Sequence, residues 1–242
     1  MRIELQPAFL LHSRKISDSR LLVDFLTRDF GVVGAIARAP SKKKSAFSVF
    51  CPALVSWVGG KPLKTLTDYE LAQHGPPAMF GHALYCGFYI NELLQRLMPK
   101  GESCPAVYDT YKKTLGHLNA ISRAEPSGNV LIQVEPLLRE LELLVLEELG
   151  YLVDFSADAN TGEPLEKNKS YYLDIHSGFS EAGNPAWPVF DGAVIAAMAE
   201  RNFTDNRHRS AMKRMMRILL LPLLGSKPLK SRELFAGHLN HA

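Results

Sequence analysis

The sequence is poor in cysteine and lacks the motifs that hold nucleotides or catalytic metals. The only cysteines among its 242 residues are Cys51, Cys86 and Cys104, which are too few and too scattered for a disulfide framework or a zinc knuckle. We expect buried thiols in a reducing compartment. A Walker-type phosphate loop, a GxSxG nucleophile motif, an HExxH zinc helix and a helix-opening GxGxxG are all missing.

The remaining polar residues form no recognisable catalytic set. Gly59-Gly60-Lys61 resembles the start of a phosphate loop, but no Ser or Thr follows, and we predict a hairpin turn there. The eight histidines are dispersed, and none is spaced with a cysteine or carboxylate like a metal ligand. The sequence therefore predicts no catalytic residue, no metal site and no cofactor, which argues against an enzyme.

Long hydrophobic runs are missing too. The longest apolar run, residues 218–224, is only seven residues long and includes Pro222, whereas a membrane-spanning helix needs about 20. The N-terminus lacks the charged, apolar and small-residue regions of a signal peptide. These features predict a cytoplasmic protein with no membrane partner.

Charge is distributed unevenly along the chain. The net charge of +3 hides an excess of basic residues at both ends: residues 1–77 carry 11 Lys/Arg against 6 Asp/Glu (+5), and residues 201–242 carry 9 against 2 (+7). Between them, residues 78–155 carry 6 against 10 (−4) and residues 156–200 carry 2 against 7 (−5). Basic ends are typical of surfaces that meet a polyanion, although clustering on an ordinary solvated surface gives the same pattern.

Short runs rich in β-branched and aromatic residues fill the first 75 positions and are separated by turn residues. Five such strands predict a small closed barrel of the OB-fold type, which commonly binds oligonucleotides. Most of the aromatic residues in this part should fill the barrel core, and a minority are candidates for stacking on bases. The strands expected are 8–12, 21–26, 32–37, 49–58 and 64–71.

Helical spacing of apolar residues follows Gly75-Pro76-Pro77. The turn-rich, acidic residues 154–190 interrupt it and include a short strand candidate at 171–173. The fold class expected is therefore α+β, with an N-terminal five-stranded OB-fold barrel followed by a mainly helical domain. The helices expected are 79–98, 106–121, 130–149, 192–200, 209–221 and one that begins near Ser231. The segments expected are 1–77 (the barrel), 78–153 (helical), 154–190 (turn-rich) and 191–242 (C-terminal helices packing on the helical domain).

Basic residues near the predicted strand ends are the first candidates for contacts with DNA. Lys42-Lys43-Lys44 lies in a loop between the third and fourth strands, where flexible cations can follow phosphates. A second set lies on the predicted helix 209–221 and just beyond it, and the alternative for this set is a solvated helix face paired with the acidic middle. The candidates are Arg14, Arg20, Arg38, Lys42, Lys43, Lys44, Arg209, Lys213, Arg217, Lys227, Lys230 and Arg232.

Several ordered stretches resemble the RecO family of bacterial repair proteins. They are Ala8-Phe9-Leu10-Leu11-His12-Ser13-Arg14, Asp24-Phe25-Leu26-Thr27, Gly31-Val32-Val33, Tyr89-Ile90-Asn91-Glu92-Leu93-Leu94, Leu149-Gly150-Tyr151 and Gly225-Ser226-Lys227-Pro228-Leu229-Lys230-Ser231-Arg232-Glu233-Leu234. No one stretch is chemically diagnostic, but their order is specific and covers nearly the whole chain.

That resemblance implies a DNA-binding mediator of RecF-pathway recombination that is associated with the nucleoid. It implies binding of single- and double-stranded DNA, annealing of complementary strands and cooperation with RecR. It further implies contact with single-strand-binding protein, so that RecA, an indirect partner, can replace that protein on DNA. Many members of the family carry a four-cysteine zinc element after the long helix. Residues 152–190 contain no cysteine, so the metal is not carried over.

Arg139 is the candidate for contact with the acidic tail of single-strand-binding protein. It is the only basic residue between Leu131 and Leu149, and a guanidinium holds a terminal carboxylate in a bidentate manner. A local ion pair with Glu135 or Glu142 is the alternative. For the whole chain, the alternative to a DNA-binding mediator is an adaptor whose basic ends bind acidic protein tails.

Overall fold

The computed structural model describes all residues except 40–46, 61, 73–78, 125–129 and 237–242. The chain forms two compact units: one contains Met1–Val130 together with Lys227–Ala242, and the other contains Leu131–Ser226. The division expected from the sequence, into 1–77, 78–153, 154–190 and 191–242, follows the type of secondary structure in each segment. It remains a prediction.

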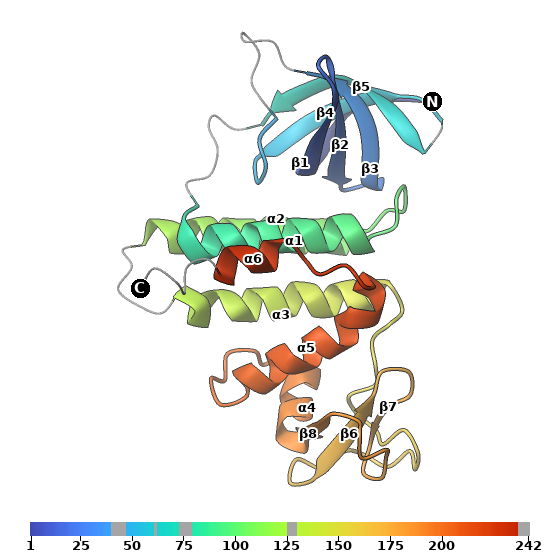
Figure 1. Ribbon diagram of the computed structural model, residues 1–242, viewed down its shortest axis with the longest axis vertical. Coiled ribbons are helices and arrows are strands. Elements are labelled where there is room, and N and C mark those ends of the chain that lie inside the picture. The colour runs from blue at the N-terminus through green and yellow to red at the C-terminus, as the bar shows by residue number, and fades with distance from the viewer. Residues whose placement is uncertain (40–46, 61, 73–78, 125–129, 237–242) are drawn as a thin grey trace. The chain divides into compact units, whose positions relative to one another are not determined.

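A closed β-barrel forms the N-terminal part of the first unit (Figure 1). Its strands follow the order β1-β2-β3-β5-β4, and β3 and β5 are the only parallel neighbours described. Alternating apolar residues of the strands, such as Val23, Phe25 and Val55, fill its core. The predicted α+β class with an OB-type barrel is therefore confirmed. The strands are β1 Arg2–Ser17, β2 Arg20–Thr27, β3 Gly31–Arg38, β4 Pro52–Val58 and β5 Leu63–Leu71.

The first strand is much longer than predicted. The predicted strand covers 8–12, where four consecutive residues, Ala8 to Leu11, are buried, but β1 extends over 16 residues. From His12 to Ser17 all its residues are exposed, so no apolar alternation marks this part. Hydrogen bonding to β2, rather than burial, holds it in strand conformation. The Gly59-Gly60 turn between the antiparallel β4 and β5 agrees with the prediction.

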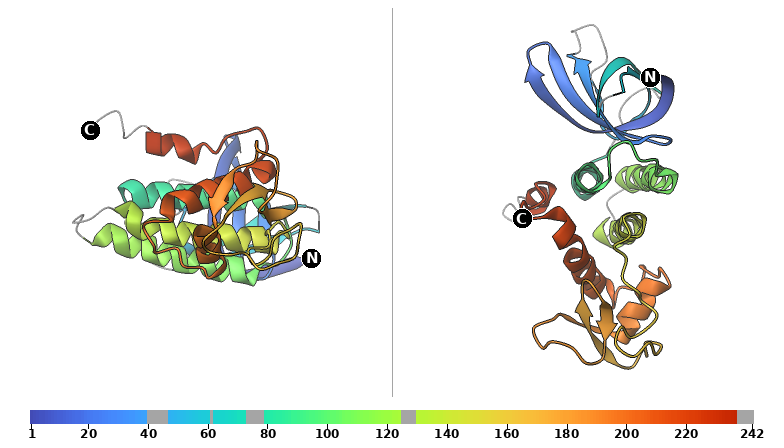
Figure 2. Two further views of the ribbon diagram at one scale, coloured as in Figure 1. Left: turned by 90° about the horizontal axis from the view of Figure 1, so that it is seen from below. Right: turned by 90° about the vertical axis from the view of Figure 1, so that its right-hand side faces the viewer.

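Two helices pack beside the barrel, and Figure 2 (right) shows them side by side and nearly end-on. They are α1 Gly81–Leu97 and α2 Pro105–Arg123. The buried Asn91 amide of α1 donates to the carbonyls of Leu10 (3.3 Å) and Leu11 (3.0 Å) on β1. The Tyr111 hydroxyl of α2 in turn donates to Asn91 Oδ1 at 2.6 Å. A buried polar group satisfied in this way fixes how the strand meets the helices.

The C-terminal segment returns to α1 through its backbone. Glu92 accepts hydrogen bonds from the Lys230 N–H (3.0 Å) and from the Ser231 N–H (2.8 Å) and hydroxyl (2.7 Å), at the start of α6 Ser231–Ala236. Arg96 donates to the carbonyls of Lys227 (2.8 Å) and Pro228 (3.3 Å). Burial by itself would raise the pKa of Glu92, but the hydrogen bonds from Ser231 and Lys230 lower it.

The second unit combines helices with a small antiparallel sheet, which Figure 1 shows in yellow and orange. The sheet has the order β7-β6-β8. Tyr171 and Phe179 are buried in this unit, and Phe179 packs edge-on against Phe190. The elements are α3 Val130–Glu148, β6 Ser170–Asp174, β7 Gly178–Ser180, β8 Val189–Asp191, α4 Gly192–Ala199 and α5 Arg209–Leu224.

Cysteines and aromatic residues lie where the sequence predicted. Cys51, Cys86 and Cys104 are buried thiols. Phe9, Phe25 and Trp57 are almost fully buried, and Phe30 and Phe47 pack against the barrel core. Within the described ranges, no helix is both long and apolar enough to cross a membrane.

Candidate nucleic-acid interface

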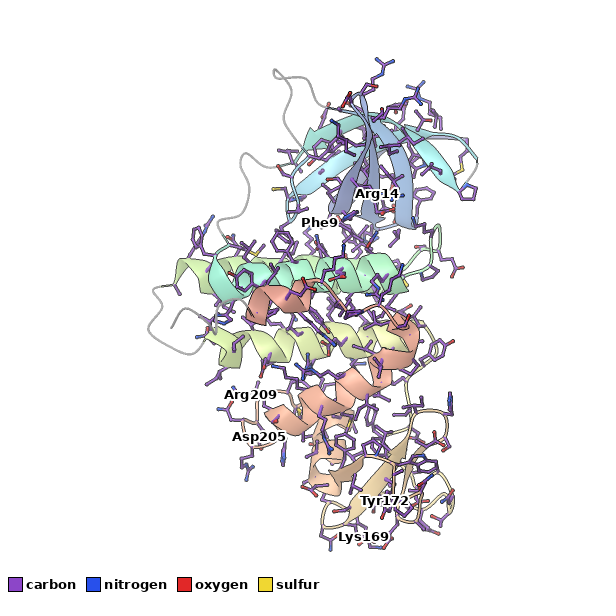
Figure 3. All side chains as sticks on the ribbon, in the orientation of Figure 1. Phe9, Arg14, Lys169, Tyr172, Asp205 and Arg209 are labelled. Carbon is purple, nitrogen blue, oxygen red and sulfur yellow. The ribbon has the colours of Figure 1, made fainter. Side chains whose placement is uncertain are left out.

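Three arginines predicted to contact DNA lie on one face of the β1–β2–β3 sheet. Arg14 on β1 is opposite Leu22 on β2, which is opposite Ile36 on β3. Arg20 on β2 is directly opposite Arg38 on β3. Because side chains two residues apart share a face of a strand, all five residues lie on the same side. We call this set, Arg14, Arg20, Leu22, Ile36 and Arg38, the outer face; Arg14 is labelled in Figure 3.

The charges of the outer face are not neutralised. All three arginines are exposed, and none forms an ion pair with a carboxylate of the described residues. Like charges directly opposite one another on neighbouring strands are destabilising, so the Arg20–Arg38 pair lowers rather than raises fold stability. Leu22 and Ile36 between them are half-buried. Cations around an apolar strip match a nucleic acid, whose phosphates are anionic and whose bases are flat and apolar.

The same sheet face ends at a buried acidic residue. Asp24, opposite Gly34, accepts hydrogen bonds from Lys100 Nζ at 3.0 Å and from Gln95 Nε2 at 3.1 Å. A Cβ on Gly34 would lie 3.2 Å from both Asp24 Oδ1 and Lys100 Nζ, so glycine leaves room for this pair. Lys100 is not among the predicted contacts, since its approach to the barrel depends on the packing of the segment after α1.

The structure describes the second basic set but not the predicted lysine loop. Lys42, Lys43 and Lys44 lie outside the described residues. On α5, Arg209 Nε and Lys213 Nζ both pair with Glu135 of α3, at 3.1 and 2.6 Å. These pairs correspond to the alternative of a basic helix face paired with the acidic middle. Arg217 is exposed. Figure 3 labels Arg209.

The three cations of the C-terminal stretch belong to the first unit. Lys227 and Lys230 expose their side chains while their backbones bind Arg96 and Glu92 of α1. Arg232 is half-buried. The stretch that resembles other family members is therefore anchored through main-chain groups, and its lysine side chains stay available.

Arg139 is buried, with a relative exposure of 7%, and pairs with Glu142 at 2.6 Å. This is one of the two local pairs that the sequence analysis left open. Its Nε is buried without a hydrogen-bond partner among the described residues. A further basic pair that the sequence analysis missed is Lys112 and Lys113, exposed on α2. The helical spacing of the buried residues of α2 would have shown that this pair lies on the exposed face of the helix.

The residues of the turn-rich segment do not fit a zinc ion. Asp158 is a buried carboxylate of this segment, with an exposure of 7%, but its two oxygens are already occupied. Oδ1 accepts the N–H groups of Asn160 (2.8 Å) and Thr161 (3.1 Å), and Oδ2 accepts that of Glu181 (2.7 Å). Within the ranges that the structure describes, no group of three His, Cys, Asp or Glu could hold a metal.

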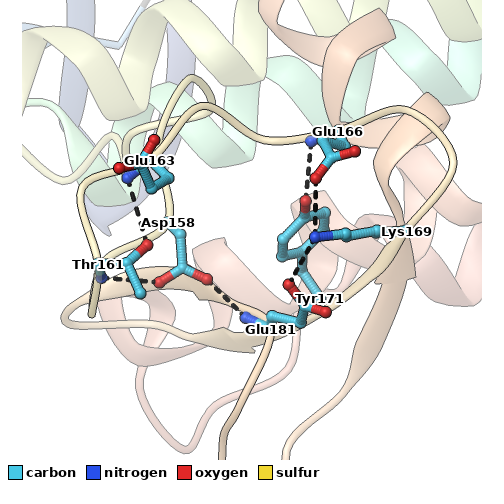
Figure 4. A network of polar contacts seen from close by, with 7 residues as sticks. All are labelled: Asp158, Thr161, Glu163, Glu166, Lys169, Tyr171 and Glu181. Carbon is cyan, nitrogen blue, oxygen red and sulfur yellow. Dashed lines mark hydrogen bonds and ion pairs between the residues drawn. The ribbon is translucent and has the colours of Figure 1, made fainter.

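A second set of bonds closes the same segment (Figure 4). Lys169 bridges Glu166 at 2.7 Å and Glu181 at 3.0 Å, and these two carboxylates raise the pKa of its ammonium group. The Glu166 N–H donates to the Tyr171 hydroxyl at 2.8 Å. Hydrogen bonds and ion pairs within the chain thus connect the loops that border the sheet.

A closed five-stranded barrel with unpaired cations on its outer sheet face is typical of the OB-fold class of nucleic-acid-binding proteins. Comparison with known proteins narrows this class. Residues 1–74 match the family model "Recombination protein O N terminal", and residues 81–233 match "Recombination protein O C terminal". The chain belongs to the RecO family.

Relatives match this chain over nearly their full length. A DNA repair protein RecO of Cellvibrio japonicus is 39% identical over 97% of this chain and 98% of its own. A DNA repair protein RecO of Haemophilus influenzae (strain 86-028NP) is 39% identical over 99% of this chain and 98% of its own. One of Hahella chejuensis is 36% identical over 98% of this chain and 97% of its own. Membership gives the chain a role in DNA repair and recombination, as a mediator rather than an enzyme.

Proposed function

We propose that this protein binds single- and double-stranded DNA through the outer face and anneals complementary strands. The observation that carries the proposal is the cluster of Arg14, Arg20 and Arg38 on one face of an OB-type barrel, each exposed and without an acidic partner among the described residues. Keeping three such charges close together costs folding free energy. Binding of a polyanion removes that cost.

Contacts of this kind favour annealing because they involve phosphates rather than base edges. Arginines that bind the backbone leave the Watson–Crick edges free to pair and carry no sequence preference. Neutralised phosphates also repel each other less, so two complementary strands can approach on the same surface. The exposed Lys227 and Lys230, the lysine loop at 42–44 and Arg217 are proposed to extend the contact along the DNA.

Family resemblance supports three protein partners. RecR is proposed to act together with this chain, and RecA to benefit indirectly once single-strand-binding protein has been displaced. Arg139 is proposed to hold the C-terminal tail of single-strand-binding protein. Its Nε lacks a hydrogen-bond partner among the described residues but is buried, so the side chain would have to move to present it to a carboxylate, and the nitrogen that binds Glu142 would have to exchange partners. A protein with these contacts is expected at the nucleoid.

Titration of a labelled oligonucleotide at several salt concentrations tests the DNA interface. The variant replaces Arg14, Arg20 and Arg38 together by Ala. The slope of log affinity against log salt should become shallower by about 2, because each lost phosphate contact on a single strand removes about 0.7. At about 0.1 M salt this corresponds to a loss of affinity of roughly 100-fold, and strand annealing should slow in parallel.

A matched control removes the same charge elsewhere. Arg2, Lys167 and Arg207 each pair with a carboxylate on the surface, so replacing them by Ala removes three positive charges outside the outer face. This control should keep the wild-type slope. Equal losses in the two variants would contradict a localised interface. Wild-type protein that binds acidic peptides but no DNA would favour the adaptor instead.

A further inference from the structure

The β1–β2 hairpin carries an apolar residue at its tip. From His12 to Arg20 every residue is exposed, and the turn connects Ser17 to Arg20. Ile16 lies one residue before the end of β1 and is 53% exposed. It is absent from the barrel core and from the residues packed against that core. Burial within the first unit therefore does not account for an aliphatic side chain at this position.

A β-bulge sets Ile16 apart from the ladder. Lys15 is paired with Leu21 and Ser17 with Arg20, which leaves Ile16 without a cross-strand partner. An extra residue of this kind bends the strand and re-aims a side chain. The bulge lies between arginines on both sides: Arg14 precedes it on β1, and Arg20 follows across the turn, opposite Arg38. The charge of Lys15, which also precedes it, is paired with Asp18 at 2.7 Å. A bound DNA backbone would thus find positive charge on either side of the bulged residue.

We propose that Ile16 is a wedge that inserts against the bases at the boundary between single- and double-stranded DNA. The inference rests on the proposed DNA binding by the outer face, which continues into this hairpin. Proteins that distort DNA use Ile, Leu, Phe or Met in the same way, inserted between base steps while cations hold the phosphates. A boundary is the preferred substrate because its last base pair is the easiest to unstack.

The wedge separates two roles within one site. The arginines supply affinity that depends on salt and not on DNA form, since phosphates are present in every form. Ile16 supplies the preference for a boundary, since an apolar side chain gains only where a base face is open to it. Partly annealed strands contain such a boundary, so the wedge directs the protein to the place where annealing advances.

A forked duplex with 2-aminopurine at the last base pair reports unstacking by its fluorescence. Wild-type protein is expected to raise the fluorescence of the fork. Ile16→Ser should lose that rise and bind the fork roughly tenfold more weakly, as expected from no longer burying one aliphatic side chain. Its affinity for a plain single strand and its salt slope should stay at wild-type values.

Leu5→Ser is the matched control. Leu5 is also an exposed aliphatic residue of β1 (56%) and also lies in an irregular stretch of the ladder, between Ile3 and Gln6, but on the part paired with β4. The Leu5→Ser variant should raise the fluorescence of the fork as the wild-type protein does. The wedge alone is wrong if the wild-type protein binds the fork without raising its fluorescence, or if Ile16→Ser has the same effect on the fork as the wild type. If the wild-type protein binds neither the fork nor the single strand, the proposed function is wrong, and the wedge with it.

Discussion

Replacing Asp158 by Asn tests whether one carboxylate holds the turn-rich segment in place. Asp158 is buried and accepts three main-chain N–H groups, from Asn160, Thr161 and Glu181. The first two donors belong to its own loop, and the third lies 23 positions further along, directly after β7. Loss of the negative charge should therefore loosen the loop and its attachment to the sheet together.

The size of the effect follows from the three bonds. Hydrogen bonds to a charged group contribute about 1.5–3 kcal/mol each, and neutral ones about 0.5–1.5 kcal/mol. In the Asp158→Asn variant, the amide oxygen can still accept the two N–H groups of the loop, each at a loss of about 1 kcal/mol. The amide NH2 then faces the Glu181 N–H, where a donor meets a donor at a further cost of about 1–2 kcal/mol. The sum, about 3–4 kcal/mol, corresponds to a fall in Tm of about 6–16 °C for a chain of this size.

The dependence of stability on pH has a defined sign. Burial by itself would raise the pKa of Asp158, but the N–H groups of Glu181, Asn160 and Thr161 lower it below the ordinary value. A carboxyl group whose pKa is lower in the folded than in the unfolded state makes its full contribution to the free energy of unfolding above the unfolded pKa. That contribution is lost as the pH falls through the lowered folded value. Asp158→Asn should therefore be less stable at neutral pH and approach the wild type in strong acid.

Thermal unfolding by circular dichroism, with hydrogen exchange at the amides of 160, 161 and 181, measures both effects. Asp174→Asn is the control: Asp174 also accepts two local bonds, from the His176 N–H and the Ser177 hydroxyl, but it is only half-buried at the end of β6. We expect it to cost no more than about 1 kcal/mol. An Asp158→Asn melting temperature within about 2 °C of the wild type would refute the reasoning, and so would an equal loss in Asp174→Asn.

Four further outcomes are expected. Replacing Lys42, Lys43 and Lys44 together by Ala should weaken oligonucleotide binding and reduce its salt slope, with Tm almost unchanged; unchanged affinity removes the loop from the interface. Metal analysis of the purified protein should find no stoichiometric zinc, and chelators should not lower Tm; one zinc per chain contradicts this. Glu92→Ala should increase proteolysis of the C-terminal segment, because it removes the acceptor of three hydrogen bonds; wild-type cleavage rates argue against the anchor. Arg139→Ala should abolish binding of the tail peptide while annealing of naked DNA continues, and Arg139→Lys, which keeps the charge beside Glu142, distinguishes lost recognition from unfolding. If the Arg139→Ala variant binds the peptide with wild-type affinity in a fluorescence titration, Arg139 does not contact the tail and its role is the ion pair with Glu142.

The sequence by itself determined the parts of the fold that depend on local burial. Runs of β-branched and aromatic residues located all five barrel strands except the exposed half of β1, and helical spacing located the helices, because both patterns mark the residues that are buried. The low cysteine content and the missing phosphate loop predicted neither a disulfide framework nor a nucleotide-phosphate site. The ordered family stretches, such as Tyr89–Leu94, gave the family.

Tertiary structure decided which charges remain free. Arg20 and Arg209 have similar positions in the chain, each at the start of an element, β2 and α5 respectively. Arg209 pairs with Glu135, and so does Lys213, 78 positions away from that acid along the chain, because α5 packs beside α3. Arg20 instead lies opposite another arginine. No local pattern contains this difference, since pairing between distant residues depends on strand register and helix packing. The exposed half of β1 was missed for the same reason: its backbone hydrogen bonds, not its side chains, keep it a strand.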